Sequence, residues 1–290
     1  MSKVVSSKNT SEVKYRRPLN KQQLTVLGSL YWYRFCTSKQ LAISLDKSSH
    51  KTIQNKLQIL EAQGLIGKRY GKSYKLAGRP AEYFITPKGA RALENAFPGA
   101  TNTRATRSLY KNQTVSDDFV THCIAIRETA IRLCDIYSEQ KTKKLRRISK
   151  SHMAKYDTYP AWSPDLHLQY EPTNDTSYHY FLDIWDGTKP FFVMVRKAQN
   201  YVKFKKEGRW PATTTFPATL AICEDKRTQT KLNRQMKRIL SDTWDDKLIF
   251  ATTTKQLLHE ATKPADEIWS KVDDYGEAQL SSLKGLFLSL

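Results

Sequence analysis

Hydrophobic residues recur at helical spacing between residues 20 and 64, and this pattern predicts three short amphipathic helices. The first follows Asn20 as N-cap, the second follows Thr37 in a capping box, and the third starts at Ser48 or Ser49. Gly64 is a suitable C-cap for the third helix. The apolar positions are Leu24, Leu27, Leu30 and Tyr31, then Leu41, Ile43 and Leu45, then Ile53, Leu57 and Leu60.

The pattern that follows predicts a hairpin with a basic turn. Residues 65–70 and 81–85 read as strands, and residues 71–80 form the turn between them. Thr86 then caps a fourth helix, with Pro87 at the first helical position, which Pro favours. Three helices, a hairpin and another helix are the order of a winged helix-turn-helix domain. The hairpin carries five cations that we expect to contact phosphates: Lys68, Arg69, Lys72, Lys75 and Arg79.

The third predicted helix has one polar side. His50, Lys51, Gln54, Asn55 and Gln58 lie off its apolar stripe, and such side chains hydrogen-bond base edges and phosphates in the major groove. Any amphipathic helix has a polar side, so this helix alone decides nothing. Because the basic hairpin follows this helix in the sequence, the two together favour DNA binding.

A second pattern of helices and strands begins after residue 111. Residues 97–108 are rich in Thr and contain Pro and Gly, which marks a linker. Residues 117–137 read as a long helix. Strands are then predicted at 145–149, 164–170, 178–185, 216–223 and 247–253, and helices at 191–207, 225–240 and 254–261. This αβββαβαβ order predicts an α+β or α/β protein of two domains.

We place the boundaries of these parts where the pattern changes. A flexible basic tail is expected at residues 1–19, a winged-helix domain at 20–97, a linker at 98–110 and a second domain at 111–290.

The charge distribution favours a nucleic-acid partner. The chain has 48 Lys and Arg against 28 Asp and Glu, a net charge of +20, and the first 110 residues carry 20 of these cations and only 5 acids. A basic surface kept for solubility is the alternative, but such surfaces usually interleave both signs. A membrane partner would need a basic amphipathic helix with a broad apolar face, and no segment has this pattern.

Several other classes of protein do not fit the sequence. The longest apolar run, from Phe191 to Val195, is far too short for a membrane span. Residues 1–17 lack the apolar stretch of a secretory signal. The four Cys are widely separated and the six His show no ligand spacing, so we expect neither disulfides nor zinc. A reducing cytoplasm is the expected location.

Two acids of the second domain are candidates for chemistry. Asp165 follows Pro164 at a strand start, and Asp183 lies in the next strand. Carboxylates on adjacent strands can share a divalent cation, which can activate water or stabilise a leaving oxygen. Asp is also common at strand ends because it favours turns. Two carboxylates in an αβββαβ order resemble the restriction-endonuclease-like PD-(D/E)xK nuclease fold.

Longer stretches of sequence resemble known families. The wording LEAQGLIGKRY…GRPAEYFITPKGARAL is similar to MarR/PadR-type winged helices over residues 20–96. The segments SPDLHL, YFLDIWDGT and RKAQNY resemble the replication-relaxation family over most of residues 20–240. That family joins a winged helix to a divergent PD-(D/E)xK nuclease-like domain and includes MobC-type plasmid mobilisation relaxases, which nick DNA at a transfer origin.

The resemblance implies an active site in the second domain. Asp165 matches the family's PD acid and Asp183 its strand acid, and both would bind Mg or Mn if the protein is active. Lys197 and Tyr201 follow one turn apart on the next helix. Lys197 would be catalytic or contact a phosphate, and Tyr201 would be a nucleophile or a core aromatic.

The sequence also departs from the family pattern. Trp185 stands where the family has a second strand acid, and the neighbouring Asp186 faces the opposite side of a strand. No Lys stands two residues after Asp183. Asp186 and Tyr201, together with His122 and Glu128 on the first helix of the domain, are weaker candidates for the same site.

Three functions remain open from the sequence. The first is sequence-specific binding of double-stranded DNA in plasmid mobilisation, conjugation or replication, with nicking of an origin as a relaxase. The second is a non-catalytic accessory factor, and the third is a winged-helix transcriptional regulator on an operator. A homodimer and other relaxosome proteins are the further partners considered, and no membrane partner is expected.

Overall fold

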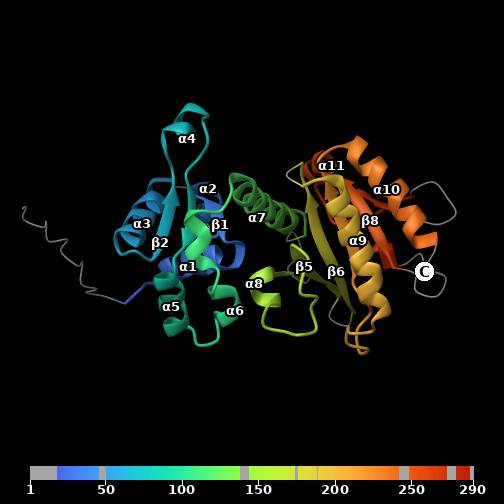
Figure 1. Cartoon of the computed structure of the whole chain (residues 1–290), viewed down its shortest axis with the longest axis horizontal. Helices are drawn as coiled ribbons and strands as arrows, with labels where there is room; N and C mark the ends of the chain where they lie inside the picture. The colour runs from blue at the N-terminus through green and yellow to red at the C-terminus, as the bar shows by residue number, and fades with distance from the viewer. Residues whose placement is uncertain are drawn as a thin grey trace, which may run out of the picture.

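The computed structural model shows two groups of elements that lie along one long axis (Figure 1). The structure describes residues 18–45, 50–137, 144–173, 176–187, 189–241, 248–272 and 279–287. The expected basic tail at residues 1–19 falls almost wholly outside these ranges. Within them, no helix is long and apolar enough to cross a membrane.

The first group consists of helices around a small antiparallel sheet with the strand order β1-β3-β2. Its elements are α1 (Lys21–Tyr33), β1 (Phe35–Thr37), α2 (Ser38–Ile43), α3 (His50–Ala62), β2 (Ile66–Arg69), α4 (Lys72–Leu76), β3 (Glu82–Ile85) and α5 (Pro87–Ala96). Strand β1 and helix α4 were not expected from the sequence. In Figure 1 the β2–β3 hairpin, with α4 at its tip, projects from the rest of the molecule.

Local signals fix the ends of these helices. The Asn20 side chain accepts from the backbone N–H of Gln23 at 3.0 Å, and the Gln23 side chain accepts in return from the N–H of Asn20. Thr37 closes the same kind of box before α2. Gly64 follows α3 with a φ of +69°, a left-handed conformation that glycine adopts without strain. The predicted caps Asn20, Thr37 and Gly64 are confirmed, whereas the predicted start of the third helix at Ser48 or Ser49 lies outside the described residues.

The expected linker packs against the first group. It contains α6 (Thr103–Thr106) and leads into the 3₁₀ helix η1 (Leu109–Gln113). Asn112 is fully buried: its amide donates to the carbonyl of Ile85 at 3.4 Å and accepts from the Arg34 guanidinium at 2.5 Å. Residues just past the expected linker therefore belong to the packing of the first group.

The second group is a seven-stranded sheet with helices on both faces. Its elements are α7 (Asp117–Tyr137), β4 (Lys144–Ser149), α8 (Lys150–Met153), β5 (Leu166–Thr173), β6 (Thr176–Trp185), α9 (Phe191–Lys206), β7 (Ala218–Cys223), α10 (Lys226–Ser241), β8 (Phe250–Thr254), α11 (Lys255–Glu260), β9 (Trp269–Lys271), β10 (Gln279–Ser281) and the 3₁₀ helix η2 (Gly285–Phe287). The strand order is β10-β9-β8-β7-β6-β5-β4. Strands β6, β7 and β8 are parallel, and the other pairs are antiparallel.

Alternation along the strands produces two apolar layers. Leu166, Leu182 and Leu220 point to the face covered by α7, whereas Phe181 and Trp185 point to the face covered by α9 and α10. The predicted order of helices and strands from residue 117 to residue 261 is confirmed, with α8 as an addition. Strands β9 and β10 lie beyond it and were not predicted.

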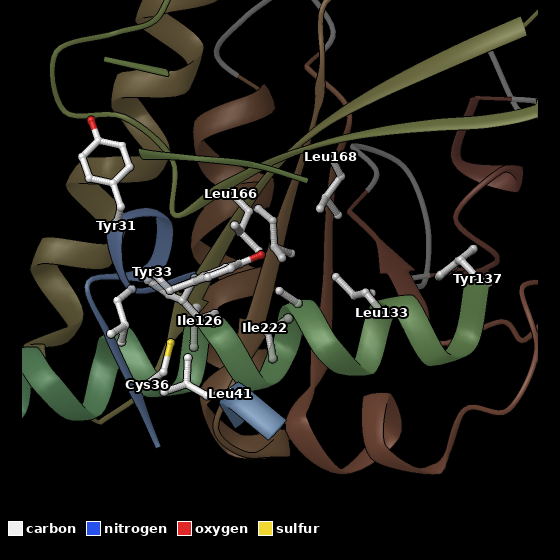
Figure 2. Packing of buried hydrophobic residues seen from close by; sticks show 14 of the residues in the cluster. Tyr31, Tyr33, Cys36, Leu41, Ile126, Leu133, Tyr137, Leu166, Leu168 and Ile222 are labelled. Carbon is white, nitrogen blue, oxygen red and sulfur yellow. The ribbon is translucent and has the colours of Figure 1, made fainter. Parts of the chain in front are cut away.

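The two groups share one continuous apolar core along α7. Figure 2 shows Ile126, Leu133 and Tyr137 of α7 beside Leu166, Leu168 and Ile222 of the large sheet. Tyr33, Cys36 and Leu41 of the first group reach the same helix. The chain is thus a mixed α and β protein with two sheets, and α7 joins its two parts.

Candidate functional site

The large sheet brings the two predicted acids together. Asp165 immediately precedes β5, and the pairing of Leu166 with Leu182 places it beside Asp183 of β6. The backbone N–H of Asp165 donates to Oδ1 of Asp183 at 3.0 Å, and the N–H of Ile184 donates to Oδ2 of Asp165 at 2.9 Å. Asp165 and Asp183 are 2% and 1% exposed, so both carboxylates lie out of bulk water.

Protein side chains surround both carboxylates. Nζ of Lys150, the first residue of α8, lies 2.6 Å from Oδ1 of Asp165. Nζ of Lys197 on α9 lies 2.5 Å from Oδ1 of Asp183 and 3.9 Å from Oδ1 of Asp165. The Tyr201 hydroxyl, one turn further along α9, donates to Oδ2 of Asp183 at 2.7 Å.

His122 of α7 reaches the same cluster from the opposite face of the sheet. Its Nε2 lies 3.2 Å from Oδ2 of Asp165, and its Nδ1 lies 2.9 Å from Oδ2 of Asp186. Nζ of Lys189 lies 3.3 Å from the same Nε2. Asp186 therefore belongs to the cluster, on the other side of β6 from Trp185. Glu128 is exposed on α7 and makes none of these contacts.

The contacts set the protonation of the cluster. Burial raises the pKa of Asp165, but Lys150, Lys197 and His122 outweigh burial and hold this pKa well below its usual range. Burial lowers the pKa of His122, but the hydrogen bonds to Asp165 and Asp186 outweigh burial, and the net pKa is raised.

The pKa values of Tyr201 and Lys150 are both raised, so both groups keep their protons. Burial and the neighbouring Asp183 raise the pKa of Tyr201 well above 10, so its hydroxyl remains a donor. Burial lowers the pKa of Lys150, but Asp165 outweighs it and the net pKa is raised. A phenol held in this way is suited to support Asp183 and is poorly suited to act as a nucleophile.

The cluster does not fit a divalent cation as it stands. All four oxygens of Asp165 and Asp183 already accept from an ammonium, a hydroxyl, an imidazole or a backbone N–H. A metal ion would have to displace two lysines from carboxylates that have almost no exposed surface. Among the residues described, no group of three or more His, Cys, Asp and Glu side chains could hold a metal ion.

The pocket beside the cluster is also positively charged. It has a volume of about 280 Å³, and Lys150, Lys189, Arg196 and Lys197 line it together with the single carboxylate of Asp165. A second pocket of about 220 Å³ lies between the two parts of the chain and shares Lys150 and Asp165 with the first. This excess of positive charge favours an anion over a metal cation.

The second candidate surface lies on α3. Ile53, Leu57 and Leu60 are buried as the apolar stripe predicts, while Asn55 and Gln58 are exposed and Gln54 is half-buried. The side chains of His50 and Lys51 fall outside what the structure describes. The polar side predicted for this helix is present in Asn55 and Gln58.

The five hairpin cations divide into two sets. Arg69 and Arg79 both contact Glu82, which is almost fully buried, and Asp117 at the start of α7. The Arg69 guanidinium lies 2.5 Å from Asp117 and also donates to the carbonyl of Val115 at 2.8 Å, and Arg79 lies 2.9 Å from Glu82 and 3.5 Å from Asp117. These two cations hold the hairpin against α7.

The three lysines of the hairpin have no carboxylate partner within the described residues. Nζ of Lys68 and Nζ of Lys75 lie 5.3 and 5.7 Å from the centre of the Tyr70 ring, and Lys72 is exposed. Leu76, which follows Lys75 at the end of α4, is 90% exposed. The hairpin therefore presents a basic tip with one apolar side chain.

Sequence reasoning missed Lys150 and Lys189 as members of the cluster. Lys150 starts a four-residue helix after a basic strand, and Lys189 lies in the loop after β6. Neither lies in a motif, and the chain offers 48 Lys and Arg to choose from. Lys150 and Lys189 are identified as members of the cluster only by their positions in the folded structure.

The geometry defines the class of the protein: a mixed α and β chain with a helix and basic hairpin at one end and a buried carboxylate–lysine cluster in its larger sheet. A family model described as replication-relaxation matches residues 27–219. The chain belongs to the replication-relaxation family, which points to a role in the replication or mobilisation of mobile elements. No curated protein and no solved structure matches the chain.

Proposed function

We propose that residues 20–97 form a winged helix-turn-helix that binds duplex DNA during replication or mobilisation of a mobile element. The observation that carries this proposal is the pairing of an exposed polar helix face with a basic hairpin. Asn55 and Gln58 on α3 have the side chains that read base edges in the major groove. Lys72 and Lys75 are exposed at the hairpin tip, where a wing meets the DNA backbone.

The ion pairs of the hairpin support this proposal. Arg69 and Arg79 are engaged with Glu82 and Asp117, so the hairpin is braced against α7 without the help of the lysines. The lysines then remain available for phosphates. A rigid wing with uncommitted cations binds with a smaller loss of conformational freedom than a mobile one.

We further propose that the second part of the chain acts as an accessory to DNA binding, and that Asp165 and Asp183 do not nick DNA with Mg or Mn. The observation that favours this role is the pair of lysines that occupies the carboxylates. Trp185, which stands in the place of the family's second strand acid, is buried in the apolar layer under α9 and α10.

Selection of bound sequences from a random pool of duplex DNA tests the first proposal. Asn55→Ala and Gln58→Ala in the full chain should relax the preference at their base positions by about 1–3 kcal/mol for each lost base contact. Asn95→Ala, an exposed asparagine on α5, is the matched control and should leave the preference unchanged. An unaltered preference in both α3 variants would refute readout by this helix.

Plasmid relaxation tests the accessory role. A supercoiled plasmid that carries the DNA flanking the gene should stay supercoiled with the protein and either Mg²⁺ or Mn²⁺. Conversion to open circles by the wild type, but not by Asp165→Asn, would show that the carboxylates are catalytic.

A further inference from the structure

Helices α9 and α10 form a second basic surface, on the outer face of the large sheet. They pack side by side in Figure 1, at the opposite end of the long axis from α3. Helix α9 carries five Lys and Arg and α10 carries six, and neither helix contains an Asp or Glu. A surface kept only for solubility would interleave both signs of charge.

The cations form stripes that face the solvent. On α10, Arg227, Lys231, Arg234 and Arg238 follow one another at spacings of four, three and four residues, so they lie on one face. At a rise of 1.5 Å per residue this stripe is about 16 Å long. One strand of a DNA duplex presents a phosphate about every 3.4 Å of its axis, so the stripe spans several phosphates.

Helix α9 extends the surface beside α10. Its exposed Arg196, Lys203 and Lys206 lie on the outer side of the helix. Nζ of Lys231 lies 4.2 Å from the centre of the Phe191 ring, which places the beginning of α9 against the first half of α10. The two stripes therefore belong to one surface.

These cations have few acidic partners among the residues that the structure describes: of the stripe residues, Arg227 interacts electrostatically with Asp225, which immediately precedes α10. None of the exposed stripe residues on α9 and α10 forms an ion pair with a carboxylate in the part of the chain that the structure describes. Within the described part of the chain most of their positive charge is therefore uncompensated, and the surface is complementary to a polyanion.

The apolar sides of both helices are used inside the protein. Leu232 and Met236 of α10 and Ala198 and Tyr201 of α9 are fully buried against the sheet. Insertion into a membrane would need these side chains at the surface, so a lipid bilayer is a poor partner. A regular array of phosphates, as in duplex DNA, is the partner that the stripes fit.

We propose that the α9–α10 surface binds the sugar–phosphate backbone of a second duplex DNA segment, so that one chain bridges two duplexes. Because α3 and α9–α10 lie at opposite ends of the molecule, each surface can hold its own segment (Figure 1). The contact reads phosphates and not bases, because the stripes consist of Lys and Arg without a protruding recognition helix. This inference uses none of the residues of the hairpin.

A capture assay with the full chain tests bridging. Protein is loaded on an immobilised duplex, and retention of a second, labelled duplex is measured for the wild type and for Arg234→Gln/Arg238→Gln. The control is Lys263→Gln/Lys284→Gln, which removes the same charge from exposed positions outside the two helices. Wild type and control should retain the second duplex, and the α10 variant should lose it. Retention by the α10 variant at the control level, or no retention by the wild type, would overturn the inference.

A second measurement separates this inference from the proposed winged helix. The full chain with Lys72→Ala/Lys75→Ala should still bind a single duplex. When Arg234 and Arg238 of this variant are also changed to Gln, the slope of the logarithm of the binding constant against the logarithm of the salt concentration should fall by about 1.8. A hairpin variant that binds like the wild type would count against the winged helix alone. An unchanged slope after the added α10 substitutions would count against the second surface alone.

Discussion

Asp165→Asn tests whether the carboxylate cluster is an internal ion-pair network or a metal site. The substitution keeps the size of the side chain and removes its charge. In the structure Oδ1 of Asp165 lies 2.6 Å from Nζ of Lys150 and 3.9 Å from Nζ of Lys197, so its charge balances these two cations. Oδ2 of Asp165 accepts from the N–H of Ile184. Asparagine can still accept from that N–H through its carbonyl oxygen. The expected loss therefore comes from the lysines and from His122, whose Nε2 lies 3.2 Å from Oδ2 of Asp165.

The size of the loss follows from how exposed each lysine is. Removing one partner of a fully buried ion pair costs about 3–5 kcal/mol. The Lys150 side chain is 46% exposed and recovers much of its hydration, and Lys197 keeps Asp183 as a partner. We therefore expect Asp165→Asn to lower the free energy of unfolding by about 2–3 kcal/mol.

Urea denaturation at neutral pH in the presence of a chelator measures this loss. The control is Asp117→Asn, which removes the acid from two ion pairs, with Arg69 and Arg79; because this acid is 55% exposed, the change should cost less than about 1 kcal/mol. A metal site predicts the opposite sign, because two unpaired carboxylates repel each other without a cation. An Asp165→Asn variant as stable as the wild type or more stable in chelator, with Mg²⁺ stabilising only the wild type, would refute the network.

Three further predictions concern single contacts. Because the pKa of His122 is raised in the fold, its stabilising effect is present below about pH 6.5 and is lost as the pH rises through the folded pKa. The difference in unfolding free energy between the wild type and His122→Gln should therefore shrink as the pH rises. A difference that grows with pH would contradict the raised pKa. Tyr201→Phe removes the hydroxyl that donates to Oδ2 of Asp183 and should lower the free energy of unfolding by about 1–3 kcal/mol in urea denaturation. DNA binding should stay as in the wild type. A loss of DNA binding with unchanged stability would mean that Tyr201 contacts the DNA. Arg69→Gln should lower stability and leave the salt dependence of DNA binding unchanged, because its guanidinium is held by Asp117; a lower salt slope in titrations would instead make Arg69 a phosphate contact.

The parts of the fold that depend on neighbouring residues could be predicted from the sequence. The capping boxes at Asn20 and Thr37, the C-cap at Gly64 and the alternating strands are local patterns. The approach of Asp165 to Asp183 was also predictable, because consecutive strands that pair in one sheet bring their facing positions together.

The parts that depend on distant residues could not be predicted. Lys150 and Lys189 reach the cluster from a short helix and a loop, and no periodic pattern marks them. Arg69 pairs with Asp117, 48 residues away, so the sequence could not separate it from the lysines of the hairpin. The packing of Asn112 under the first sheet likewise depends on contacts with Arg34 and Ile85, and residues 98–110 alone do not reveal it.

The net charge of the residues after 110 does not reveal the basic surface of α9 and α10. The residues after 110 have nearly balanced charges, 28 Lys and Arg against 23 Asp and Glu, so the sequence directed attention to the first 110 residues. The structure shows where the cations gather: α9 and α10 carry eleven Lys and Arg and no Asp or Glu. Net charge over a long segment does not report such a separation.

Binding of the full chain to duplex DNA as a function of salt tests the central claim most directly. The wild type should bind with an affinity that falls steeply as salt rises. Lys72→Ala/Lys75→Ala should reduce the log–log slope by about 1.8, since each phosphate contact contributes about 0.9. Lys263→Ala/Lys284→Ala removes the same charge elsewhere and should leave the slope unchanged. A hairpin variant with the slope of this control, or a wild type without salt-dependent binding to duplex DNA, would contradict the account.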